Sequence, residues 1–135
     1  MDDDNVWTEE WDPGEDWSRR GAQSKRLPRG DDLGATVYQL GPCNWVPFHF
    51  HHASEESRQV AEGEVVVRFP TGPEGVHGLS NETEMPVRYV MVSTLHSPEV
   101  AEYPDIGKIT AQARTASETG ERLWVIHDLE SPVKE

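Results

Sequence analysis

Residues 47–56, PFHFHHASEE, place three histidines and two glutamates within ten positions. Side chains alternate between the two faces of a β-strand, so His49 and His51 would project from the same side, roughly 6.6–6.8 Å apart along the chain. Two imidazoles at that spacing can lean toward one ion and bind it at about 2.0–2.1 Å from each nitrogen. His52 would point to the opposite face. The stretch therefore indicates a metal site with His49 and His51 as ligands.

A carboxylate from the same stretch would add an oxygen ligand. Straight alternation after His51 favours Glu55, whereas Glu56 requires a bend across HAS. A further ligand has to come from elsewhere, and His77 is the remaining histidine that lies in a turn-rich segment, FPTGPEGVHGLSN. The alternative is a set of solvent-facing histidines that form only hydrogen bonds. The neighbouring glutamates and His77 make the metal site the preferred interpretation.

The composition limits the choice of partners and compartment. The chain has 135 residues, which is typical of one domain, and a formal net charge of −13. That charge repels phosphate backbones and anionic lipid headgroups, so we expect neither nucleic acid nor membrane as a partner. The first ten residues are acidic rather than basic and apolar, and no apolar run is long enough to span a membrane. We therefore expect a cytoplasmic protein.

The elements that would position the histidines have a β-like pattern. Short apolar stretches rich in β-branched and aromatic residues predict strands, and the segment TAQARTASETGER predicts a short helix or a loop. Closely spaced strands of this kind are typical of a sandwich, jelly roll or barrel. The predicted strands cover residues 34–40, 64–69, 87–94 and 123–127, and the helix or loop covers residues 110–122.

An arm of opposite charges precedes the predicted strands. Residues 2–18 carry eight acids and no base, with three tryptophans among them, whereas residues 19–29 carry five bases and no acid. One interpretation is an anion-binding or partner-binding patch. The preferred one is an arm whose two halves attract each other while the tryptophans dock on the domain. The domain boundaries that we expect are an arm at 1–33, a barrel at 34–108 and an extension with a late strand at 109–135.

Two segments resemble the two motifs of the cupin superfamily. HFHHASEE resembles the first motif, a glycine followed by H-x-H, a glutamate and a second glycine. FPTGPEGVHGLSN resembles the second, with Pro-x-Gly, a histidine and an asparagine, and PVRYVMVST with YPDIGK is also similar to small single-domain bacterial cupins. The resemblance covers residues 34 to 108.

This resemblance implies a β-jelly-roll barrel with a divalent metal ion inside, held by His49, His51, Glu56 and His77. Glu55 remains the alternative carboxylate ligand, and its position beside the site makes it the candidate for proton transfer. The metal would be Fe, Mn, Ni, Co or Zn. The resemblance implies a small-molecule ligand or substrate, and an isomerase or dioxygenase as the enzyme class. A non-catalytic ligand-binding module and a metal-free, degenerate cupin that works through protein contacts are the alternatives, and a homodimer is expected.

The chain departs from the cupin pattern in two ways. Cys43 stands where the first motif has its glycine, so we expect a strained backbone there. Gly63 closes the first motif and also opens the second, so there is no room for the strands that normally lie between them. A hairpin needs on the order of 12–17 residues. We therefore expect a barrel shortened by one hairpin, with exposed strand edges.

Overall fold

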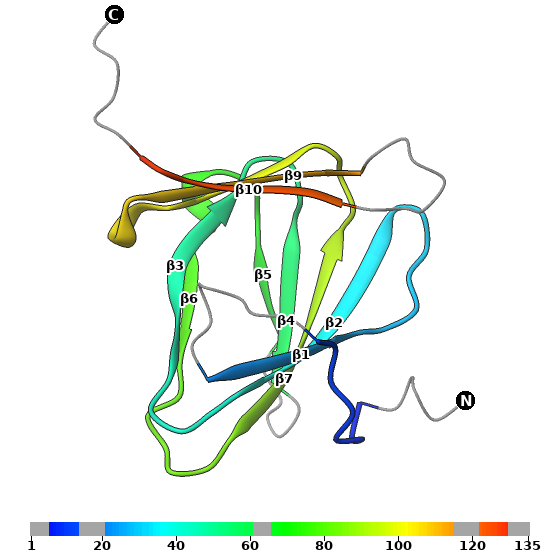
Figure 1. The fold of residues 1–135 in the computed structure, drawn as a ribbon, viewed down its shortest axis with the longest axis vertical. Coiled ribbons are helices and arrows are strands. Elements are labelled where there is room, and N and C mark those ends of the chain that lie inside the picture. The colour runs from blue at the N-terminus through cyan, green and yellow to red at the C-terminus, as the bar shows by residue number, and fades with distance from the viewer. Residues whose placement is uncertain (1–5, 14–20, 61–65, 115–121, 130–135) are drawn as a thin grey trace, which may run out of the picture.

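The chain folds into two antiparallel sheets that enclose a common interior (Figure 1). The computed structural model describes residues 6–13, 21–60, 66–114 and 122–129. Within these residues the strands and 3₁₀ turns are β1 (Ala22–Arg26), β2 (Leu33–Leu40), β3 (Trp45–His51), β4 (Glu56–Val60), β5 (Val66–Phe69), η2 (Pro73–Gly75), β6 (His77–Ser80), β7 (Val87–Thr94), β8 (Glu99–Tyr103), η3 (Pro104–Ile106), β9 (Lys108–Arg114) and β10 (Arg122–Asp128). The first sheet has the order β1-β2-β7-β4-β5, and the second has the order β10-β9-β8-β3-β6.

This architecture confirms the predicted all-β barrel. The four predicted strands correspond to β2, β5, β7 and β10, although residues 64 and 65 lie outside the described part of the chain. The prediction of a helix or loop over 110–122 is wrong for its first half, because residues 110–114 belong to β9. That strand pairs with β8 on one side and β10 on the other, and pairing on both sides outweighs the weak local preference of its Ala and Gln residues.

The expected loss of one hairpin agrees with the topology. β4 pairs directly with β5, and only residues 61–65, outside the described part, lie between them. Five residues are too few for two further strands and a turn. As a result, within the described residues β5 pairs only with β4, and β6 pairs only with β3. Both are edge strands.

The interior contains both apolar and polar side chains. Leu40, Val46 and Tyr89 form a buried apolar cluster. The other buried side chains include several polar ones, which are His49, Ser54, His77, Asn81, Glu99 and Thr110. Burying polar groups is costly unless they have partners, so an interior of this kind indicates a binding site rather than a core.

The arm docks on the first sheet through Trp11. Lys25 Nζ lies 5.6 Å from the centre of the Trp11 ring and donates to Thr8 Oγ1 at 2.6 Å. The Arg88 guanidinium also lies over the Trp11 ring, 4.9 Å from its centre, and Arg88 Nη2 pairs with Glu9. Cation–π contacts and an ion pair thus attach residues 6–13 to β1 and β7.

The turn before β3 has the predicted strain. Cys43 is the one non-glycine residue in the described part of the chain with a positive φ, 54°, in the region that favours glycine. Its thiol is free and exposed. The left-handed residue ends the turn that leads into Trp45, where β3 begins.

No helix in the described segments is both long and apolar enough to cross a membrane.

Candidate metal centre

Four side chains that could bind a metal ion come together inside the barrel. One donor atom from each of His49, His51, Glu56 and His77 lies within 4.8 Å of the others. β3 contributes the first two histidines, β6 contributes His77, and β4, in the opposite sheet, contributes Glu56. The site therefore depends on the two sheets facing each other, and no single segment of sequence contains it.

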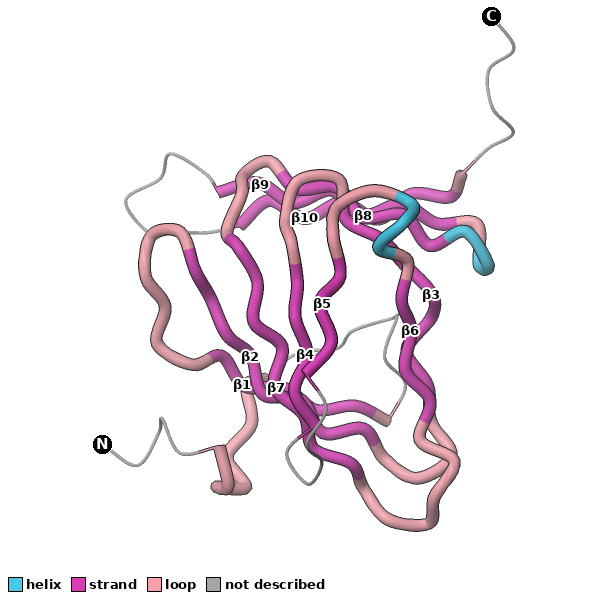
Figure 2. Tube along the Cα trace, turned by 180° about the vertical axis from the view of Figure 1, so that it is seen from behind, coloured by secondary structure: helices cyan, strands magenta, loops and turns pink. Residues whose placement is uncertain are grey.

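The η2 turn brings His77 beside β3. His77 pairs in register with His49, directly after η2, which Figure 2 shows between β5 and β6. A Cβ atom on Gly75 would collide with the carbonyl oxygen of Pro70, so this turn requires glycine. The turn is thereby tight enough to bring His77 back to the site.

The loop between β3 and β4 decides which glutamate reaches the histidines. β3 ends at His51 and β4 begins at Glu56, so residues 52–55 carry the chain from one sheet to the other. Alternation along one strand, which favoured Glu55, does not continue through this loop. Glu56 Oε1 lies 3.3 Å from His51 Nε2, and Glu56 Oε2 lies 3.1 Å from His77 Nε2.

The hydrogen bonds of the imidazoles set their donor atoms. His49 Nδ1 lies 2.9 Å from the Pro47 carbonyl oxygen, and His77 Nδ1 lies 2.8 Å from that of Gly75. A carbonyl oxygen only accepts, so each Nδ1 carries its hydrogen and, in a neutral ring, Nε2 presents a lone pair. His77 Nε2 then faces an acceptor, Glu56 Oε2. Two acceptors at 3.1 Å require a positive charge between them, either a second proton or a cation.

The protonation of two of the side chains also fits a metal ion. Burial, and next the charge of His77, lower the pKa of His49 from 6.5 to about 4. Burial raises the pKa of Glu56, but hydrogen bonds from His51 and His77 outweigh it and hold that pKa well below its ordinary value. His49 is therefore neutral and Glu56 is ionised at pH 7, which are the forms that bind metal.

Aromatic rings hold two of the imidazoles in place. Phe69 stacks on His77 with ring centres 3.9 Å apart, and Tyr103 stacks on His49 at 5.0 Å. Only 5% of His49 and 6% of His77 is exposed. Rings packed in this way lose little further freedom on binding an ion. The donor set of three imidazoles and one carboxylate suits Fe, Mn, Ni, Co or Zn.

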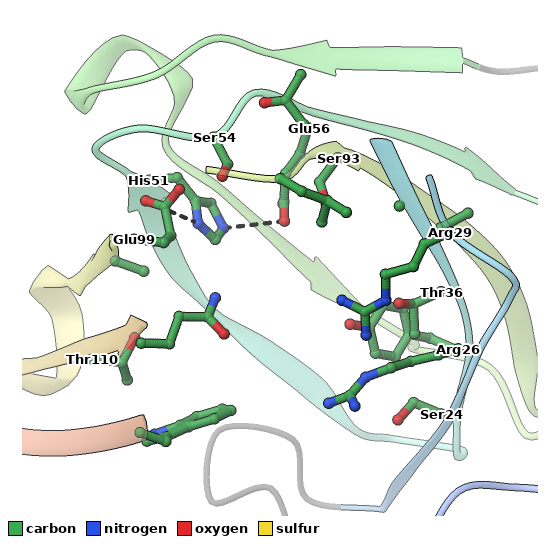
Figure 3. Close-up of a pocket in the computed structure, with 18 of the residues that line it drawn as sticks. Ser24, Arg26, Arg29, Thr36, His51, Ser54, Glu56, Ser93, Glu99 and Thr110 are labelled. Carbon is green, nitrogen blue, oxygen red and sulfur yellow. Dashed lines mark ion pairs between the residues drawn. The ribbon is translucent and has the colours of Figure 1, made fainter. Parts of the chain in front are cut away.

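A large cavity opens beside His51 and Glu56. Its volume is about 1160 Å³, and strands of both sheets line it. Figure 3 shows His51, Glu56 and Glu99 on one side of the cavity, with Ser54 and Ser93 nearby, and Arg26 and Arg29 on the other side. Ligand pockets for small molecules have volumes of roughly 300–1,000 Å³. The cavity is thus large enough for a small molecule to reach His51 and Glu56, the two donors that line it.

The other candidates from the sequence lie outside the group. The Glu55 carboxylate pairs with Arg68 at 2.8 Å, where both are substantially exposed, and Glu55 does not line the cavity. His52 points away, as alternation predicts, and its Nε2 lies 2.6 Å from Glu102. Asn81 is a turn residue, since its amide donates to three carbonyl oxygens. The part of Glu55 in proton transfer stays a prediction.

Sequence reasoning missed Glu99. Only 3% of this residue is exposed, and its Oε1 accepts from the backbone N–H groups of His52, Ala53 and Val100. The same oxygen lies 3.8 Å from His51 Nδ1. Oε2 has no hydrogen-bond partner among the described residues, and Glu99 lines the cavity.

A signal for Glu99 is present in the sequence. In EVAEY, alternation places Glu99 on the same face as Ala101 and Tyr103, and all three are buried. An acid on an otherwise apolar face is a candidate functional residue.

The chain matches known proteins in structure. No protein-family model matches the chain, and no curated protein does. A sugar phosphate isomerase from a cupin superfamily of Silicibacter pomeroyi matches with a TM-score of 0.66 and 21% identity, over 82% of this chain and 78% of the other. A putative sugar phosphate isomerase from Acidithiobacillus ferrooxidans matches with a TM-score of 0.60 and 21% identity, over 85% and 83%.

A third solved structure is more distant. It is the polyketide cyclase RemF from Streptomyces resistomycificus, with a TM-score of 0.52 and 18% identity, over 58% of this chain and 68% of the other. Identities at this level establish the fold. Together with the two-sheet barrel, these likenesses confirm the resemblance in the sequence: the chain has the cupin fold.

Proposed function

We propose that this protein is a metal-dependent isomerase that acts on a small polar molecule. The observation that carries the proposal is the group of His49, His51, Glu56 and His77. Two of its members, His51 and Glu56, line a cavity of about 1160 Å³. A group with four suitable donors within 4.8 Å argues against a degenerate, metal-free cupin, because the shortened barrel still gathers them.

The donor set determines what a bound ion would supply. A divalent ion held by three imidazoles and one carboxylate would act as a Lewis acid on a carbonyl or hydroxyl oxygen of the substrate. The protein contributes a fixed arrangement of ligands, since the carbonyl oxygens of Pro47 and Gly75 orient two of the rings.

Isomerisation of a hydroxy-carbonyl compound also requires a group that moves a proton. Glu99 is well placed for this, because its Oε2 has no hydrogen-bond partner among the described residues and the residue lines the cavity beside His51. Its other oxygen is held by three backbone N–H groups, so the carboxylate is fixed in position. Glu55, paired with Arg68, is the less favourably placed of the two.

The solved relatives support an isomerase over an oxygenase. The two with TM-scores of 0.66 and 0.60 are described as a sugar phosphate isomerase and a putative sugar phosphate isomerase. The polar wall of the cavity, with Ser54, Ser93 and Thr110, suits a substrate with several hydroxyl groups.

The direct test is an NMR assay of aldose–ketose interconversion with a panel of small sugars and sugar phosphates. We expect turnover by protein supplied with Fe, Mn, Ni, Co or Zn, and none after chelation. Glu99→Gln keeps an oxygen for the three backbone donors and should lower kcat about 10²–10⁴-fold, as removal of a proton-transfer group does. The Glu99→Gln variant should bind as much metal as the parent protein.

Glu102→Gln is the matched control, because Glu102 lies on the same strand but contacts His52 at the surface. It should leave kcat unchanged. Turnover that is independent of metal would contradict the proposed function, and equal turnover by the Glu99→Gln variant would contradict the role of Glu99.

We also propose that the protein forms a homodimer through β10. Leu123, Trp124, Val125 and Ile126 are all 40% or more exposed. β10 is an edge strand that pairs only with β9 among the described strands. An exposed apolar edge strand is a site where another strand adds readily, and a second copy would cover it.

A further inference from the structure

Two arginines face the candidate metal centre across the cavity. Arg26 is the last residue of β1, and Arg29 follows it in the loop toward β2. Both line the cavity, and Figure 3 shows them on the wall opposite His51 and Glu56. Both are solvent-accessible, so a molecule that enters the cavity can reach them.

The guanidinium of Arg26 has no carboxylate partner among the described residues. In contrast, Arg68 pairs with Glu55 at 2.8 Å and Arg88 pairs with Glu9 at 2.7 Å. The chain has 25 acidic residues and a net charge of −13, so an arginine without such a partner is notable. The nearby Asp12 carboxylate accepts a hydrogen bond from the backbone N–H of Arg26, at 2.8 Å.

Two residues with hydroxyl groups, Ser24 and Thr36, line the cavity together with the two arginines. Ser24 is two residues before Arg26 on β1, so alternation places both side chains on one face. Thr36 of β2 pairs in register with Arg26. Ser24 and Thr36 line the cavity beside the arginines (Figure 3). Guanidinium and hydroxyl donors together match the oxygens of a phosphate or a carboxylate.

We propose that Arg26 and Arg29 bind an anionic group of the substrate, a phosphate or a carboxylate, while the other end of the substrate reaches the metal centre. That the other end of the substrate reaches the metal centre rests on the proposed function, since the inference names the substrate class of the same site. Carboxylates of Glu56 and Glu99 lie at one side of the cavity and guanidinium groups at the other. The cavity is thus polarised, and it selects a molecule with an anionic end and a neutral, oxygen-rich end.

The test follows the Nε–H signals of arginine by NMR. Metal-free protein is titrated with inorganic phosphate, and in a second series with malonate, at constant ionic strength. Without metal, the anion has no ion to bind, so the signals report on the arginines alone. We expect saturable shifts of Arg26 and Arg29 with at least one of the two anions, and none for Arg68.

The titrations give an affinity for each anion, and variants test which arginines contribute to it. Arg26→Gln combined with Arg29→Gln should weaken binding of the anion at least about tenfold, because hydrogen bonds to charged groups are lost. Arg68→Gln removes an arginine outside the cavity and should leave the affinity unchanged. Stronger binding of phosphate than of malonate would assign a phosphate subsite, and the reverse would assign a carboxylate subsite.

Absence of shifts at Arg26 and Arg29 with both anions would overturn the inference, and so would equal affinity in the double variant. Metal content, measured on separate samples, distinguishes this failure from failure of the proposed function. A protein that binds phosphate at the arginines but no metal keeps the anion subsite and loses the isomerase. A protein that binds metal but neither anion keeps the proposed isomerase and loses the anion subsite.

Discussion

Single hydrogen bonds give the candidate metal centre its chemistry. Backbone carbonyl oxygens accept from Nδ1 of His49 and of His77, which leaves Nε2 of each ring for an ion. Glu56 spans two imidazoles, with one oxygen near His51 and the second near His77. A second proton on the imidazole, or a bound cation in its place, joins His77 Nε2 to the Glu56 carboxylate.

The lowered pKa of His49 predicts how stability depends on pH. In the unfolded chain this residue takes up a proton below pH 6.5, whereas in the folded, metal-free protein it does so only below about pH 4. The unfolded state therefore binds more protons in this window, and the free energy of unfolding falls as the pH is lowered from 6.5 to 4. The loss from His49 is at most about 3.5 kcal/mol. The lowered pKa of Glu56 acts in the same direction, below the ordinary value of 4.5.

Urea unfolding of chelator-treated protein across this pH range measures the effect. A His49→Gln variant removes the titrating group, so its stability should fall less steeply with decreasing pH. Parallel curves for the two proteins would show that His49 does not carry the dependence.

Residue types and spacing predicted part of the site. Alternation along β3 correctly placed His49 and His51 on one face and His52 on the other. Two large apolar side chains of the same strand, Trp45 and Phe48, are both 53% exposed. Alternation explains Phe48, which points outward because His49 points inward. It does not extend to Trp45, because the pairing of β3 with β6 is irregular between Val46 and His49.

At the scale of elements, the turn between β6 and β7 supports the strand that carries His77. Asn81 follows β6 directly, and its Nδ2 donates to the carbonyl oxygens of Leu40, Gly41 and Met85. The amide is buried and joins the ends of β2 and β6 to this turn. Asn81 thus fixes the position of β6, which is an edge strand.

Asn81→Ala should lower the free energy of unfolding by about 2–3 kcal/mol, because one buried and two part-buried carbonyl oxygens lose their donor. Asn44→Ala is the control, since the Asn44 amide donates to a single exposed carbonyl, that of Pro42. Its cost should stay below about 1 kcal/mol. Chemical unfolding of both variants gives the comparison, and equal losses would rule out a special role for Asn81.

The sequence could not predict how the strands and loops lie relative to one another. The strands at β2, β5, β7 and β10 have strong local patterns, and all were predicted. The choice of Glu56 over Glu55 depends on a loop that crosses between sheets, and β9 depends on pairing with two neighbours. Both are long-range effects, which a local pattern does not contain.

At the scale of the whole molecule, both sheets end in edge strands, and β10 is the most apolar of these within the described residues. If a second copy covers β10, sedimentation equilibrium should give twice the 15.2 kDa mass of the chain. Val125→Lys places a charge on the exposed edge and should shift the protein to the monomer. Leu33→Lys, at an equally exposed leucine on β2, should not. A monomeric parent protein would contradict the homodimer.

The proposed activity requires a metal ion bound by the four donors. The most direct measurement is the metal content of tag-free protein by mass spectrometry, beside His51→Ala and its neighbour His52→Ala. His52 pairs with Glu102 at the surface, so it is a matched control for a histidine outside the site. We predict near-stoichiometric metal in the parent protein and in His52→Ala, and its loss in His51→Ala. Absence of metal from all three proteins, even after supplementation with Fe, Mn, Ni, Co and Zn, would contradict the metal centre and the proposed function.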